Sequence, residues 1–285
     1  MPTTSLPPSS FWQTRRFRLD LRQPLVMGIV NTTPDSFSDG GRYLSSDAAK
    51  RHCDQLLAEG AHLLDIGGES TRPGARIPSP EEELARVLPV VQHAVGLGVP
   101  VSVDTSRPQV IEAVLAAGAD VINDVRSLRL PGALALVAAA PDVGVCLMHM
   151  PAEPGVMQQD PRYDDVVQAV QADLWQRHDE VLGAGVASER VLLDPGIGFG
   201  KTPAHNLALL SRQKELLRLP RPLLLGWSRK STLGALTGQP AAERVAISVA
   251  AALLAVERGA AVVRVHDVAA TVQALSLWRA APPAT

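Results

Sequence analysis

The chain has 285 residues, a formal net charge of −2 at pH 7 and 46% hydrophobic residues. Its length would allow two domains, but no Ser/Gly-rich linker or charge block divides it, so we expect one domain over residues 13–280. The near-neutral charge gives no reason to expect nucleic acid or an anionic membrane as a partner. The longest apolar stretch, residues 246–256, is too short to cross a bilayer.

The two ends, residues 1–12 and 281–285, are expected to be disordered tails. Residues 1–10 are rich in Pro, Ser and Thr and lack the apolar core of a signal peptide. Cys53 and Cys146 fall in a predicted helix and a predicted strand, without the spacing of a zinc site, so both are expected to be buried and unpaired. We therefore expect a cytoplasmic protein.

Eight short runs rich in Val, Ile and Leu alternate along the chain with helix-like segments. The apolar runs are residues 25–30, 61–64, 100–103, 120–122, 143–147, 191–193, 222–226 and 261–263. The helix-like segments include residues 47–59, 80–95, 108–117, 163–182, 203–217 and 241–258. Several begin with a first-turn signal, such as Ser79-Pro80, Thr202-Pro203 or Ser106 ahead of Pro108.

This alternation predicts an α/β fold, a single-domain (β/α)₈ TIM barrel. Continuous apolar runs are typical of parallel strands that are covered on both faces. Residues 17–21 alternate between polar and apolar and are expected to form a strand that closes the barrel floor.

Polar residues follow most of the predicted strands. They are Asn31, Asp104, Asn123, Asp194, Lys230, Arg264 and His266. A single Asp after a strand is more often a helix N-cap, and Asp104 by itself fits that reading. Asp65 and His149 are interpreted as structural. Because the carboxyl ends of barrel strands meet at one rim, so many polar residues there favour a binding site over separate caps.

The segment Asp194-Pro-Gly-Ile-Gly-Phe-Gly-Lys201-Thr202 is typical of a loop that faces a ligand. Its three glycines can adopt positive φ and let the backbone approach a bound molecule closely. A P-loop needs a glycine at Pro195, and the dinucleotide fingerprint needs one at Lys201, so ATP and NAD are poor candidates.

The chemistry of the rim narrows the ligand. A carboxylate at Asp194 and an amide at Asn123 can accept adjacent N–H groups, as on an aminopyrimidinone edge, and Lys230 can donate to a ring carbonyl or nitrogen. Arg264 and His266 lie two apart on one strand, so they point the same way and offer cationic donors to phosphate. The pattern predicts a fused heterocycle that carries a phosphate or diphosphate.

Two long segments resemble the signatures of the dihydropteroate synthase family. They are Met27-Gly-Ile-Val-Asn-Thr-Thr-Pro-Asp-Ser-Phe-Ser-Asp-Gly-Gly41 and Gly60-Ala-His-Leu-Leu-Asp-Ile-Gly-Gly-Glu-Ser-Thr-Arg-Pro-Gly74. Shorter matches are Asp104-Thr-Ser-Arg, Ile122-Asn-Asp-Val, Met148-His-Met, the Asp194 loop, Ser228-Arg-Lys-Ser231 and Arg264-Val-His-Asp267. They follow the family's order and spacing over nearly the whole chain.

The resemblance implies an enzyme of folate synthesis and a sulfonamide target. It would join 6-hydroxymethyl-7,8-dihydropterin diphosphate to p-aminobenzoate and release diphosphate, with Mg²⁺ held at Asn31. Catalytic roles would fall to Asp104, Lys230, Arg264, Asp39 and Arg72. The pterin would be held by Asp104, Asn123, Met148, Asp194, Gly198, Phe199 and Lys230. The diphosphate would be held by Asn31, Thr71, Arg72, Arg264 and His266, and p-aminobenzoate by Phe37, Thr71, Pro73, Phe199 and Ser231.

Two alternatives share the same barrel: a pterin-binding methyltransferase that works with a corrinoid partner, and an inactive paralogue. The first should lack the two long signatures, and the second should have lost some of the site residues. The chain departs from the family pattern at residues 151–155 and at Thr232, which we expect to lie away from the substrate contacts. The family is commonly dimeric, and the apolar residues of 241–258 and 271–278 could form a homodimer surface or simply belong to the core.

Overall fold

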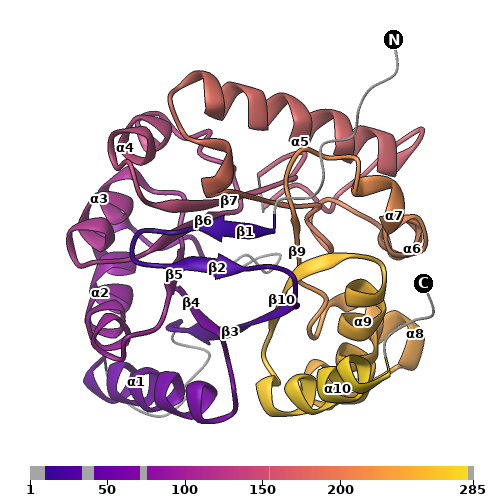
Figure 1. The fold of residues 1–285 in the computed structure, drawn as a ribbon, viewed down its shortest axis with the longest axis horizontal. Coiled ribbons are helices and arrows are strands. Elements are labelled where there is room, and N and C mark those ends of the chain that lie inside the picture. The colour runs from indigo at the N-terminus through magenta and orange to yellow at the C-terminus, as the bar shows by residue number, and fades with distance from the viewer. Residues whose placement is uncertain (1–9, 34–41, 71–75, 154, 282–285) are drawn as a thin grey trace.

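A closed barrel of eight parallel strands forms the centre of the molecule (Figure 1). The computed structural model describes residues 10–33, 42–70, 76–153 and 155–281. Around the ring the strands follow the order β10-β3-β4-β5-β6-β7-β8-β9. Their bounds are Leu25–Asn31 (β3), Leu63–Gly67 (β4), Val101–Asp104 (β5), Val121–Asp124 (β6), Gly144–Met148 (β7), Val191–Asp194 (β8), Leu223–Leu225 (β9) and Ala260–Val265 (β10). The predicted TIM barrel is confirmed.

Helices form the outer layer, where they cover the outward-facing apolar side chains of the strands. They are Arg42–Ala58 (α1), Pro80–Gly96 (α2), Pro108–Ala116 (α3), Ala133–Ala139 (α4), Val166–Gly183 (α5), Pro203–Ser211 (α6), Gln213–Leu216 (α7), Ser231–Thr237 (α8), Val245–Glu257 (α9) and Val268–Ala280 (α10). Short 3₁₀ turns at Ser188–Arg190 and Ala241–Glu243 precede β8 and α9. The helices α4 and α8 escaped the sequence analysis because seven residues are too few for an amphipathic period.

Two helices begin where the sequence predicts. Ser79 caps α2 in a capping box with Glu82, and Thr202 caps α6. The helix α3 also begins where the sequence predicts, at Pro108, but Ser106 does not cap it: Ser106 hydrogen-bonds the carboxylate of Asp124, and the N-cap residue Arg107 makes no side-chain cap bond. Ser106 therefore links the ends of two neighbouring strands instead of starting a helix.

A two-stranded hairpin closes the floor of the barrel, with β1 at Phe11–Gln13 and β2 at Arg18–Asp20 (Figure 1). The fully buried Trp12 packs into the barrel's lower end, and its indole N–H donates to the carbonyl of Arg190 at 2.8 Å. The predicted strand at the floor is confirmed. The predicted disordered tail of residues 1–12 is wrong for Phe11 and Trp12, because a Trp that fills the floor is held by the burial of its large apolar ring.

Both cysteines, Cys53 and Cys146, are buried free thiols, as expected. Within the ranges that the structure describes, no helix is both long and apolar enough to cross a membrane.

Candidate active site

The interior of the barrel changes from apolar to polar within one layer. The floor layer consists of inward-facing side chains that pack with Trp12, among them Leu63, Val121, Cys146, Leu192 and Val262. Because side chains alternate along a strand, the residue two positions further on points into the barrel again, one layer nearer the carboxyl ends. Those residues are Asp65, Asn123, Met148, Asp194 and Arg264. The predicted site residues on these strands therefore do face one interior.

A guanidinium between two carboxylates forms the base of this polar layer. Arg264 Nε lies 2.5 Å from Asp65 Oδ2, and Arg264 Nη2 lies 2.9 Å from Asp104 Oδ2. Asn123 Nδ2 donates to the same Asp65 oxygen at 3.1 Å, which leaves the Asn123 carbonyl oxygen free to accept from a ligand. Asp65 is fully buried, as expected for a structural carboxylate. It nevertheless belongs to the site, because it holds both Arg264 and Asn123.

Burial shifts the pKa values of Asp104, Asp194 and Lys230 away from their ordinary values. It raises the pKa of Asp104 to about 7, an effect that Arg264 opposes and Asp65 adds to. It also raises the pKa of Asp194, against the N–H of Gly196 and the charge of Lys230. Burial lowers the pKa of Lys230 to about 8, with Arg264 adding to the shift. Because Asp104 and Lys230 titrate near neutrality, a charged ligand can change their protonation at little cost.

Asp194 presents one oxygen to the loop and one to the site. Its Oδ1 accepts from the backbone N–H of Gly196 at 2.7 Å, so Oδ2 remains for a ligand donor. Met148 lies beside Asp194 in the β7–β8 register and lines the same interior, 3% exposed. Asp194 and Asn123 thus offer two acceptors from strands on either side of Met148.

Lys201, to which the sequence analysis gave no role, holds the loop after β8. Its ammonium group is buried and contacts the carbonyls of Gly196 and Phe199 and His149 Nδ1, each at 2.9 Å. Burial lowers the pKa of Lys201 to about 7, and burial together with Lys201 lowers the pKa of His149 to about 3. His149 is therefore a neutral acceptor with a structural part, as predicted. The only sign of this role in the sequence is the position of Lys201 at the end of the glycine-rich segment that begins at Asp194.

Other side chains hold the remaining polar groups of the loop. Gln158 donates to the carbonyl of Gly198 at 2.6 Å, and Tyr163 donates to that of Gly200 at 2.9 Å. The N–H of Gly198 donates to Asn206 Oδ1 at 2.9 Å, and Asn206 in turn donates to Thr232 Oγ1 at 2.9 Å. Thr232 was expected to lie away from the substrate contacts. The side chain of Asn206 separates the Thr232 hydroxyl from Gly198, a predicted pterin residue, and the expectation stays a prediction.

Lys230 and Phe199 meet above the interior. Lys230 Nζ lies 4.1 Å from the centre of the Phe199 ring, a cation–π distance. A Cβ atom on Gly198 would stand 3.1 Å from Lys230 Cδ, so Gly198 leaves the space in which the lysine lies. These three predicted pterin residues are therefore in mutual contact.

His266 is neutral at pH 7, whereas the sequence analysis treated it as a cationic donor. Burial lowers its pKa to about 3, and the neighbouring charges of Arg264 and Arg229 add to the shift. Its Nδ1 lies 2.9 Å from Ser228 Oγ, which also accepts the His266 backbone N–H at 3.1 Å. If Ser228 donates its proton to Nδ1, the imidazole carries its own proton on Nε2, where it can still donate to an anion.

The remaining predicted residues divide into two groups. Asn31 is half-buried at the end of β3, and Ser231 is exposed at the first residue of α8. Phe37, Asp39, Thr71, Arg72 and Pro73 lie outside the described residues.

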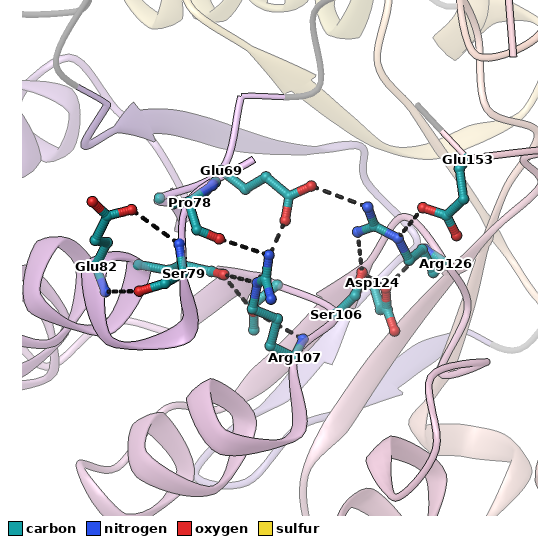
Figure 2. Close-up of polar contacts among 12 residues, drawn as sticks. Glu69, Pro78, Ser79, Glu82, Ser106, Arg107, Asp124, Arg126 and Glu153 are labelled. Atoms are coloured by element: carbon teal, nitrogen blue, oxygen red, sulfur yellow. Dashed lines mark hydrogen bonds and ion pairs between the residues drawn. The ribbon is translucent and has the colours of Figure 1, made fainter. Parts of the chain in front are cut away.

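An ion-pair network joins the outer edge of the rim (Figure 2). Arg126, after β6, binds Glu69 at 3.1 Å and Glu153 at 2.8 Å. Arg107 lies 3.9 Å from Glu69 and donates to the carbonyl of Pro78 at 2.8 Å. The network therefore connects the segments that follow β4, β5, β6 and β7, and it includes Glu153 from the stretch that departs from the family pattern.

Comparisons with known proteins identify the family of the chain. Residues 27–266 match the model of the pterin binding enzyme family. The dihydropteroate synthase of Neisseria meningitidis serogroup B is 54% identical over 275 residues, which cover 94% of this chain and 96% of that protein. The chain is a member of the dihydropteroate synthase family. Such identity over nearly the whole chain gives no support to the methyltransferase-type barrel or to the inactive paralogue.

Solved dihydropteroate synthases have the same fold. The Xanthomonas albilineans enzyme with 4-aminobenzoic acid is 52% identical with a TM-score of 0.88, covering 94% of this chain and 96% of that one. The Burkholderia cenocepacia enzyme complexed with 7,8-dihydropteroate is 51% identical with a TM-score of 0.88, covering 96% of each chain.

Replacing Gly196 by Ala should destabilise this dihydropteroate synthase more than replacing Gly185. Both glycines have left-handed φ, +69° and +97°, so each alanine costs about 1–2 kcal/mol. A Cβ on Gly196 would also stand 2.0 Å from the His149 carbonyl oxygen, whereas nothing lies within 4 Å at Gly185. This overpacking should add ~1–3 kcal/mol to the loss in the free energy of unfolding, measured by urea denaturation. Equal losses for the two variants would contradict the tight packing of the loop.

Proposed function

We propose that the polar interior of the barrel binds the pterin of 6-hydroxymethyl-7,8-dihydropterin diphosphate, which the enzyme condenses with p-aminobenzoate to 7,8-dihydropteroate and diphosphate. The observation that carries the proposal is the pair of free acceptors, Asp194 Oδ2 and the Asn123 carbonyl oxygen, in the barrel interior beside Asp65. Adjacent N–H donors of an aminopyrimidinone match them. The relatives solved with 4-aminobenzoic acid and 7,8-dihydropteroate support the same reaction.

The opposite side of the ring faces Lys230 and Phe199. The ammonium of Lys230 donates to a ring carbonyl or nitrogen, and its contact with Phe199 keeps it from turning away. Met148 contributes an adaptable apolar wall. The pterin is thereby held at two edges and one face.

Charge governs the reaction. The C–O bond to diphosphate breaks, the bonding electrons leave with the diphosphate, and positive charge develops on the methylene and the electron-rich dihydropterin. The carboxylate of Asp104 is placed to stabilise that charge, while Arg264 and His266 donate to the leaving anion. The neutral arylamine nitrogen then forms the C–N bond and loses a proton to solvent, so the reaction needs no strong base.

A magnesium ion fits the donors near the diphosphate. Within the described part of the chain, no cluster of three or more His, Cys, Asp or Glu residues could hold a metal by itself. Mg²⁺ commonly takes only one or two protein oxygens and fills its shell with water and substrate phosphates, so the half-buried amide of Asn31 suffices. The ion would neutralise charge on the leaving diphosphate.

The p-aminobenzoate would lie between Phe199 and Ser231, which flank Lys230 at the rim. Thr71, Pro73 and Phe37, with Asp39 and Arg72, would complete the site from segments outside the described residues.

A homodimer through α9 and α10 is the assembly that we propose. Three apolar residues spaced by four, Ala246, Ala250 and Leu254, are exposed along one face of α9. On α10, which packs against α9, Leu277 is 70% exposed. Exposed apolar side chains gathered on neighbouring helices are found at protein interfaces.

The buried free thiols of Cys53 and Cys146 suit a reducing compartment and support the predicted cytoplasmic location.

Asp194→Asn should weaken binding of the pterin diphosphate while the protein stays folded. The amide oxygen can still accept from Gly196, but the amide NH₂ then faces the ligand's N–H edge, donor against donor. A loss of about 1–3 kcal/mol is expected in calorimetric titration. Asp179→Asn, at a carboxylate that is 63% exposed on α5, is the control and should bind normally. Unchanged affinity in a folded Asp194→Asn variant would remove Asp194 from the pterin site.

Arg264→Ala should weaken binding of the pterin diphosphate more than binding of the bare pterin alcohol. A hydrogen bond to a charged group contributes about 1.5–3 kcal/mol, and only the diphosphate ligand loses it. Both ligands are compared on the same variant, so damage caused by unpairing Asp65 and Asp104 affects both. Equal weakening would mean that Arg264 supports the pocket and does not contact phosphate.

Repeating the wild-type titration without Mg²⁺ tests the metal. Affinity should fall for the diphosphate ligand and stay constant for the pterin alcohol. A diphosphate affinity that is independent of Mg²⁺ would contradict the metal assignment.

Leu254→Asp should convert the dimer to a monomer in sedimentation velocity at micromolar concentration, because a carboxylate would be buried in an apolar interface. Leu97→Asp places the same charge at another partly exposed leucine, 37% exposed at the end of α2, and should leave the dimer intact. A monomeric wild-type protein would end the homodimer proposal.

A further inference from the structure

The turn that carries Lys230 has a strained backbone. Arg229 adopts φ of +59°, in the left-handed region that residues with a side chain seldom occupy. Such a conformation is energetically unfavourable and persists only where surrounding contacts hold it. Because Lys230 directly follows Arg229, the direction of the Lys230 side chain depends on those contacts.

The helix α9 holds this turn through both backbone groups of Arg229. The N–H of Arg229 donates to Ser248 Oγ at 3.0 Å, and Arg244 Nη1 donates to the carbonyl of Arg229 at 3.0 Å. Arg244 Nη1 also lies 3.3 Å from the carbonyl oxygen of Lys230. Arg244 caps α9 and Ser248 is four residues further on, so the two side chains leave the same face of the helix.

The neighbouring helix leaves room for the Arg244 side chain. A Cβ atom on Gly234 of α8 would stand 2.1 Å from Arg244 Nη2, so the guanidinium lies against a bare backbone. Arg244 Nε donates to the carbonyl of Gln239 at 2.8 Å, which fixes the plane of the guanidinium. On the other side of the turn, Arg229 Nη2 binds Asp267 Oδ1 at 2.6 Å. The turn is therefore held by Arg244 and Ser248 on one side and by Asp267, the N-cap residue of α10, on the other.

We propose that Arg244 and Ser248 are positioning residues for Lys230: α9 fixes the strained turn, and the turn directs the Lys230 ammonium over Phe199 into the pterin pocket. Neither side chain needs to contact substrate. The inference rests on the proposed function, in which Lys230 binds the pterin.

A double-mutant cycle with Lys230→Gln tests the proposal, with kcat/KM measured for the pterin diphosphate and radiolabelled p-aminobenzoate. Arg244→Ala alone should lower kcat/KM by about tenfold to a hundredfold, because small misplacements of a binding group have effects of that size. In the Lys230→Gln background the same substitution should cost less than about twofold, since the group that it positions is already absent. Ser248→Ala should follow the same pattern with a smaller loss. If the Arg244→Ala variant fails to fold, the Ser248→Ala variant tests the proposal in its place.

The control is Glu243→Ala, next to Arg244 and exposed, which should match the wild type. Arg244→Lys should recover part of the loss, because an ammonium can reach one carbonyl but not both. Equal losses in the wild-type and Lys230→Gln backgrounds, or an Arg244→Ala variant as active as the control, would overturn the proposal. A wild-type protein that forms no dihydropteroate would instead refute the proposed function.

Discussion

One guanidinium holds the polar half of the barrel together. Arg264 lies between Asp65 and Asp104, and Asp65 also receives the amide of Asn123. Without the arginine, the two carboxylates would repel each other and take up protons. Without the carboxylates, the arginine would be an unpaired charge inside the barrel, which is energetically costly. The pair of acidic partners raises the pKa of Arg264 further above its usual value, although burial alone would lower it. The ion pairs therefore allow charged side chains to lie inside a largely apolar barrel.

Much of this arrangement could be predicted from the sequence because the barrel converts sequence position into spatial position. Once eight strands are recognised, Asp104, Asn123, Asp194 and Arg264 must meet at the carboxyl end of the ring. Side-chain alternation then decides which of them face inward, and it also brings Asp65 to the floor of the site. The apparent helix signal at Ser106 was misleading because local propensity says nothing about Asp124, which lies on the next strand.

What could not be predicted depends on burial and on contacts between distant segments. The ring of His266 is neutral chiefly because burial removes it from water, and burial is not visible in the motif Arg264-Val-His-Asp267, although Arg264 adds to the shift. In the sequence, Trp12 directly follows a polar tail, and nothing nearby shows that its ring fills the lower end of the barrel. Lys201 stood in a motif already selected for ligand binding, but its contacts to two loop carbonyls and His149 require the folded loop.

The loop after β8 shapes the pocket with its main chain, and this limits how the enzyme can evolve under a drug. Gly196, Gly198 and Gly200 all have left-handed φ, and a side chain at each would meet a neighbour at 3.1 Å or less. An inhibitor that packs against this loop would contact a main-chain surface on which any added side chain is strained. Substitutions that add bulk there would first damage the enzyme's own pocket. Resistance substitutions are therefore expected at residues other than these three glycines.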